Sequence, residues 1–186
     1  MRAPSYKRFF RSEAELEDAR LGLKLLLCPH CRRVGFLIGH GFAWGYAEAG
    51  SERVVRGRRF FCSNRHRRRG CGRTFSVLLA DRLYRFVVGT RTLWQYLRAV
   101  LGGRSRKAAW KRVGAAFSRA SGTRLWRKLS QAQTHIRARL CRHGPPPASS
   151  ATEPLAQLVA HLRSAFPAAD CPFAHFQSHF QTPLLP

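Results

Sequence analysis

The chain has 186 residues, of which 45% are hydrophobic, so it can form one ordinary domain or two small ones and is not expected to be disordered throughout. Its net charge is +25, from 34 lysines and arginines against 9 aspartates and glutamates, which predicts an anionic partner. No apolar run approaches the roughly 18 residues of a membrane helix, so we expect no association with a membrane.

Residues 1–27 are first basic and aromatic and then acidic. They lack the continuous apolar stretch of a secretory signal, and their cluster of acids argues against a transit peptide. We therefore expect a leader that contains a short exposed helix from about Ser12 to Leu27. The protein is expected to be cytoplasmic and nucleoid-associated, so its cysteines should stay reduced.

Two cysteine pairs follow the leader. Cys28 and Cys31 form a C-x2-C pair, and Cys62 and Cys71 form a C-x8-C pair about thirty residues later. Four thiolates in this pattern predict a structural Zn²⁺, because four sulfur ligands leave no open position for catalysis. The eight residues inside the second pair are expected to loop out as a basic finger, in which His66 is an alternative to Cys62 as a ligand.

The segment between the pairs alternates large and small side chains from Val34 to Tyr46, which predicts a strand. Further strands are expected at 56–62 and 73–79, so that residues 28–82 form an antiparallel zinc ribbon. The large side chains of the first strand either pack on the core of the sheet or stay exposed and stack on nucleic-acid bases.

Residues 89–142 are expected to form three helices. Thr90 or Thr92 is the predicted cap of the first helix, Ser105 of the second, and Ser121 or Thr123 of the third. Three short helices with a glycine turn before the last predict an all-α helix-turn-helix domain after the ribbon, and hence a small α+β fold.

A proline-rich linker is expected at 143–154, followed by an apolar, Phe-rich tail at 155–186. The tail is a candidate surface for a homodimer or a partner protein. Cys171, His175 and His179 have a C-x3-H-x3-H spacing that suggests a second metal site. The adjacent proline and the missing fourth ligand favour an apolar patch instead.

The motifs CPHC, RRFFC and CGRTFSV, followed by a helix that contains LWQYL, resemble the zinc-ribbon and helix-turn-helix region of bacterial insertion-sequence transposases. The stretch SGTRLWRKL at 121–129 is similar to the start of their recognition helix. The likeness covers roughly residues 28–140 and implies DNA binding with a structural zinc ion.

The chain departs from that family in two ways. The second cysteine pair of the family is usually C-x2-C, and full-length transposases carry three metal-binding carboxylates after this region. Beyond residue 142 this chain has only Glu153 and Asp170. The resemblance therefore implies the DNA-binding part without the catalytic domain, and we expect no enzymatic activity.

These patterns predict a zinc-stabilised protein that binds duplex DNA, with RNA binding or association with the ribosome as the alternative. The third helix is expected to read base edges, while the second helix and the finger contact phosphates. The residues expected to contact nucleic acid are Arg65, Arg67, Arg68 and Arg69 in the finger, Arg104, Arg106, Lys107, Lys111 and Arg112 around the second helix, and Arg124, Arg127, Lys128 and Gln131 on the third.

Overall fold

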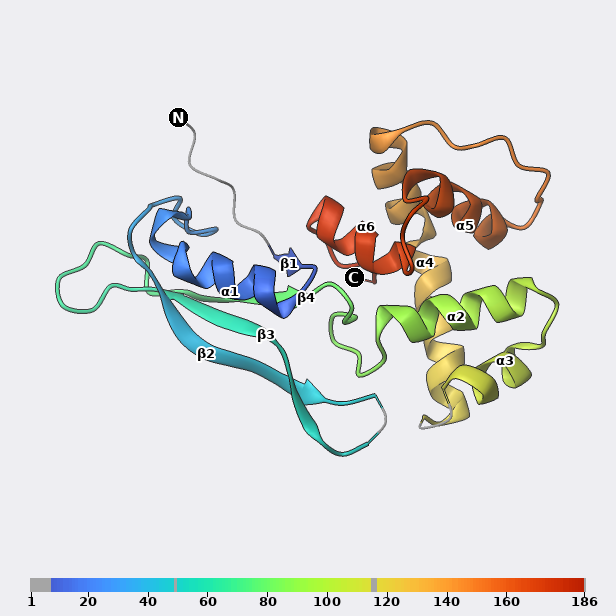
Figure 1. The fold of residues 1–186 in the computed structure, drawn as a ribbon, viewed down its shortest axis with the longest axis horizontal. Coiled ribbons are helices and arrows are strands. Elements are labelled where there is room, and N and C mark those ends of the chain that lie inside the picture. The colour runs from blue at the N-terminus through green and yellow to red at the C-terminus, as the bar shows by residue number, and fades with distance from the viewer. Residues whose placement is uncertain (1–7, 49, 115–116, 186) are drawn as a thin grey trace. The chain divides into compact units, whose positions relative to one another are not determined.

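The computed structural model describes residues 8–48, 50–114 and 117–185 (Figure 1). The chain divides into two compact units, one made of residues 1–47 and 51–80 and the other of residues 48–50 and 81–186. Within the described ranges, the structure contains one four-stranded sheet and six α-helices. The protein is therefore a small α+β protein, as its sequence predicts.

The first unit is built on the sheet, whose strands are β1 (Phe9–Phe10), β2 (Leu37–Tyr46), β3 (Arg53–Cys62) and β4 (Thr74–Leu79). The strand order is β1-β4-β3-β2. Strand β3 runs antiparallel to both of its neighbours, whereas β1 pairs with β4 in parallel. The three long strands lie close to their predicted positions, and β1 is an addition that the sequence did not reveal.

The described part of the leader contains the predicted helix, which is mostly exposed but packs a few apolar side chains against the sheet. Helix α1 (Glu13–Leu21) begins after Ser12, whose hydroxyl accepts a hydrogen bond from the Glu15 N–H at 3.2 Å. The helix ends six residues earlier than expected and is followed by the 3-10 helix η1 (Leu23–Leu25). Apolar side chains explain the packing, since Phe10, Leu16 and Leu23 are buried against the sheet.

The large even-numbered side chains around β2 divide between the two alternatives. Phe36 packs against the core beside Leu37, which is 1% exposed, whereas the aromatic side chains further along the strand lie at the surface. Phe42, Trp44 and Tyr46 are 41%, 52% and 54% exposed. Two register shifts interrupt the pairing with β3 in this region, and the β2–β3 hairpin runs past the end of α1 (Figure 1). The aromatic side chains are thus available at the surface.

The second unit is helical. It begins with α2 (Thr90–Leu101), α3 (Arg106–Val113) and α4 (Arg119–His143), which contact one another in sequence order. Ser105 caps α3 as predicted, since its hydroxyl accepts from the Ala108 N–H at 3.3 Å. The other two cap predictions are wrong. Gly89 precedes α2, while the Thr90 hydroxyl donates to the carbonyl of Asp81, and α4 already begins after Ser118.

The described part of the C-terminal tail is a structural element of the helical unit. It forms α5 (Pro154–Ala165) and α6 (Pro172–Phe180). Phe173 is fully buried and meets the ring of Trp94 edge-on at 5.1 Å. The apolar residues of both helices pack into one core with α2 and α4, and this burial explains why so apolar a segment folds back. None of the helices in the described ranges is long and apolar enough to cross a membrane.

Candidate metal centre and basic surface

The four predicted cysteine ligands lie together at one end of the sheet unit. The Sγ atoms of Cys28 and Cys71 are 3.8 Å apart, those of Cys31 and Cys62 are 3.7 Å apart, and all four lie within 4.8 Å of one another. A tetrahedral ion about 2.3 Å from each sulfur requires sulfur–sulfur distances of about 3.8 Å. The cluster can therefore hold one metal ion. Cys62, and not the exposed His66, completes it.

The first cysteine turn has the backbone geometry of a metal-binding knuckle. The N–H of Cys28 donates to the carbonyl of Arg33 at 3.0 Å, which closes the turn, and Arg32 adopts a left-handed φ of 60°. The N–H of His30 points at the Cys28 sulfur at 3.4 Å. Such a donor stabilises a thiolate.

The second turn reaches the same geometry despite its longer spacing. Ser63 and Gly70, the first and last residues between Cys62 and Cys71, lie side by side, with the Gly70 N–H donating to the Ser63 carbonyl at 3.1 Å. A Cβ atom on Gly70 would lie 2.2 Å from that carbonyl oxygen, so the position requires glycine. The N–H of Cys71 points at the Cys62 sulfur at 3.3 Å, as His30 does in the first turn. Around the sulfurs, the C-x8-C pair therefore acts as a C-x2-C turn with a six-residue excursion.

This arrangement predicts that residues 64–69 can be deleted without loss of the metal site. Deletion joins Ser63 to Gly70, which already meet, and leaves the sequence Cys-Ser-Gly-Cys. We expect one bound metal ion per chain before and after the deletion, measured by elemental analysis of the reduced protein. The matched variant Gly70→Val, which places a side chain against Ser63, should lower the metal content. A deletion variant without metal would contradict this account of the turn.

Burial and hydrogen bonding shift the pKa values of the cysteine thiols in opposite directions. Cys28 and Cys62 are fully buried, and burial raises the pKa of both thiols, that of Cys62 to about 12. Burial also acts to raise the pKa of Cys31, but the Arg33 N–H and the neighbouring sulfurs lower it to about 7. Cys28 and Cys62 are therefore protonated at neutral pH in the metal-free state, and a metal ion must displace their protons.

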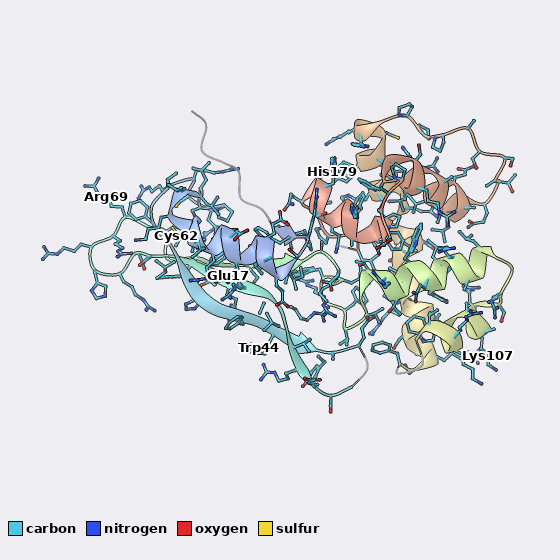
Figure 2. The ribbon with its side chains drawn as sticks, viewed as in Figure 1. Glu17, Trp44, Cys62, Arg69, Lys107 and His179 are labelled. Carbon is cyan, nitrogen blue, oxygen red and sulfur yellow. The ribbon has the colours of Figure 1, made fainter. Side chains whose placement is uncertain are left out.

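The excursion at 64–69 presents the predicted basic finger. Arg65, Arg67, Arg68 and Arg69 are all exposed, and Figure 2 shows Arg69 on the loop that leaves the sheet near Cys62. The finger is tied at both ends. The Arg65 guanidinium lies over the ring of Phe61 at 5.3 Å, and the carbonyl of Arg69 accepts a hydrogen bond from the guanidinium of Arg33. The loop is thus a folded feature with its charges in solvent.

A second basic surface covers α3 and the first half of α4. Arg124, Arg127 and Gln131 are exposed along one stripe of α4, as predicted, whereas Lys128 is half-buried at its side. Around α3, the exposed residues include all five that were predicted there: Arg104, Arg106, Lys107, Lys111 and Arg112. Within the described part of the chain, none of these cations pairs with a carboxylate. Figure 2 shows Lys107 on this surface.

Trp110 holds α3 and α4 together, a role that the sequence analysis did not identify. Its indole N–H donates to the carbonyl of Ser118 at 2.9 Å. Gly114 and Gly122 lie against its ring, where a Cβ atom would come within 2.6 Å and 2.5 Å of ring carbons. Two glycines four and twelve residues after a tryptophan are the sequence signal of this contact.

The C-x3-H-x3-H residues do not form a second metal cluster. Cys171 is buried at the start of α6, while His175 and His179 are exposed. Among the residues that the structure describes, the four-cysteine group is the one cluster of three or more potential metal ligands. The His179 ring instead contacts His143 and Phe180.

Comparison of the chain with protein-family models, with curated proteins and with solved structures finds no match.

Proposed function

We propose that the four cysteines bind a structural Zn²⁺ ion and that the sheet unit is a zinc ribbon. Four cysteine sulfurs at tetrahedral separations are the donor set that zinc prefers in structural sites, and they leave no position for a substrate or water. Cys28, Cys31, Cys62 and Cys71 would hold the ion between the start of β2 and the end of β3. The zinc would then stabilise a unit whose basic finger repels itself.

We further propose that the helical unit binds duplex DNA as a helix-turn-helix domain, with α4 as its recognition helix. The observation that carries this proposal is the row of unpaired side chains Arg124, Arg127 and Gln131 on the exposed stripe of α4, flanked by the cations of α3. Arginine recognises guanine and glutamine recognises adenine in the major groove, while surrounding cations contact phosphates. The resemblance to the DNA-binding part of transposases supports the same function.

The test is selection of bound sequences from a random duplex pool, followed by affinity measurements on the double variant Arg124→Ala/Arg127→Ala. Loss of two base contacts should weaken binding to the selected site by roughly 30-fold or more, and binding to random duplex much less. The control is Arg142→Ala, which removes an exposed arginine at the other end of α4. Equal losses on selected and random DNA would show that α4 does not read sequence.

A second candidate function is binding of single-stranded or structured RNA, which the exposed aromatic residues of β2 favour. The ring centroids of Phe42 and Trp44 lie 5.7 Å apart on the exposed face of the hairpin. The guanidinium of Arg53 lies 5.8 Å from the Trp44 ring, and that of Arg58 lies 4.4 Å from the Phe42 ring. Aromatic side chains beside cations form stacking surfaces for unpaired bases.

If this surface binds unpaired bases, Trp44→Ala should weaken binding to a single-stranded oligonucleotide by about tenfold and leave duplex binding unchanged. The measurement is a titration of each nucleic acid at matched salt concentration, since electrostatic binding depends steeply on salt. The control Leu21→Ala removes another exposed apolar side chain of the same unit. Equal affinities of Trp44→Ala and the native protein for the single strand would rule this function out.

A further inference from the structure

Three cationic side chains converge on one cavity in the helical unit. The cavity has a volume of about 230 Å³ and lies where α2, α3 and the start of α4 meet. Arg106 and Lys107 of α3 and Arg119 of α4 line it, and no carboxylate is among the described residues that line it. None of these three cations forms an ion pair with the described residues. The cavity is therefore an electropositive pocket without a counter-charge.

A tyrosine also lines this cavity. Tyr96 of α2 is only 1% exposed, and its ring meets Trp110 and Trp126 edge-on at 5.1 Å and 5.9 Å, which fixes its position. Within the described ranges, the hydroxyl has no hydrogen-bond partner. Burial raises the pKa of Tyr96 while the nearby charge of Arg106 opposes that rise, so the hydroxyl stays a neutral donor beside a cation. The hydroxyl is not fully enclosed by the described residues, so it can donate a hydrogen bond to an acceptor on a ligand in the cavity.

The start of α4 adds further donors. Ser118 makes no side-chain cap, so the first N–H groups of the helix are not satisfied by a side chain at that position. Gly122 and Thr123, on the next turn, also line the cavity. The positive end of the α4 dipole, like the three cations, favours a negatively charged group in the cavity. The lining offers many donors and positive charge, which is the chemistry that recognises an oxyanion.

We propose that this cavity binds one phosphate group, and that in the nucleic-acid complex the group is a backbone phosphate. The second part rests on the proposed DNA-binding function. The volume is below the 300–1,000 Å³ of pockets for larger ligands, and it suits a phosphate with part of its sugar. A phosphate held here would contact α3 and α4 together. It would set the register of Arg124 and Arg127, which follow on the exposed stripe of the same helix.

The experiment couples individual residues to individual phosphates. Neutral methylphosphonate linkages are placed one at a time along the selected duplex, and the affinity of each duplex is measured for the native protein, Tyr96→Phe and Lys107→Ala. Tyr96→Phe keeps the ring packing and should weaken binding about tenfold without changing the salt dependence. At one linkage position, the loss of affinity caused by the neutral linkage and the loss caused by each variant should not be additive, because both remove the same contact. The control Lys111→Ala, on the same helix but outside the cavity, should show no coupling to that linkage.

A titration of the protein with inorganic phosphate, monitored by calorimetry, distinguishes a failure of the phosphate-site proposal from a failure of the proposed DNA binding. If the native protein binds duplex DNA but no linkage couples to Tyr96 and Lys107, the cavity is not a phosphate site and the inference is overturned. If the protein binds no nucleic acid, the proposed function fails. In that case, phosphate binding that Tyr96→Phe weakens still supports the cavity as a phosphate site, and absence of phosphate binding overturns it. Circular dichroism of each variant confirms that the fold is retained.

Discussion

Replacement of Cys62 by serine is expected to abolish metal binding and to unfold the sheet unit while the helical unit stays folded. Cys62 is fully buried and lies at the end of β3, so its loss removes a ligand and leaves three thiols without an ion to hold them. A structural zinc contributes about 10–16 kcal/mol of binding free energy in small zinc domains. That energy is as large as the whole stability of an ordinary domain, which is about 5–15 kcal/mol.

The measurement is the metal content of purified Cys62→Ser together with hydrogen exchange of its backbone amides. Protection should be lost in β2, β3 and β4 and retained in α2 and α4, because the two units have separate cores. The matched control is Cys141→Ser, which changes an exposed cysteine on α4. A Cys62→Ser protein that keeps native protection in the sheet would show that the unit does not depend on metal.

Replacement of Trp110 by alanine should destabilise the helical unit by about 3–5 kcal/mol. The side chain is 3% exposed and fills the space between α3 and α4, where Gly114 and Gly122 leave no atoms to close the cavity. Its hydrogen bond to the Ser118 carbonyl also fixes the start of α4. Without it, the helix that carries Arg124 and Arg127 loses its orientation.

Thermal or denaturant unfolding monitored in the helical unit measures this effect. Trp44→Ala is the control, because it removes the same side chain from an exposed position and should change stability by no more than about 0.5 kcal/mol. If both tryptophan variants have similar unfolding midpoints, then Trp110 does not hold the two helices together.

The cluster of four cysteines could be predicted from sequence because the constraint is local and chemical. A C-x2-C turn places two sulfurs on one ion whatever surrounds it, and the structure brings Cys28, Cys31, Cys62 and Cys71 together. The spacing alone did not reveal why eight residues can separate the second pair. That answer depends on the contact between Ser63 and Gly70, which is made by backbone atoms and leaves only a glycine in the sequence.

The helices α2, α3 and α4 could be predicted from the spacing of their apolar residues, because this spacing indicates which face of a helix is buried. Periodicity does not say which partner covers that face. The sequence therefore did not show that Leu16 of the leader and Phe173 of the tail are core residues. The β2 alternation shows the same limit, since two faces with different side chains were visible but the buried one was not. The register shifts between Gly39 and Trp44 left no signal in the alternation itself.

We propose that one zinc ion held by four cysteine sulfurs stabilises the unit that carries the basic finger. Elemental analysis of the native, reduced protein, combined with X-ray absorption at the zinc edge, tests it most directly. We predict one zinc per chain with four sulfur neighbours at about 2.3 Å. Native protein that contains no zinc and whose sheet amides remain protected from exchange would contradict the claim.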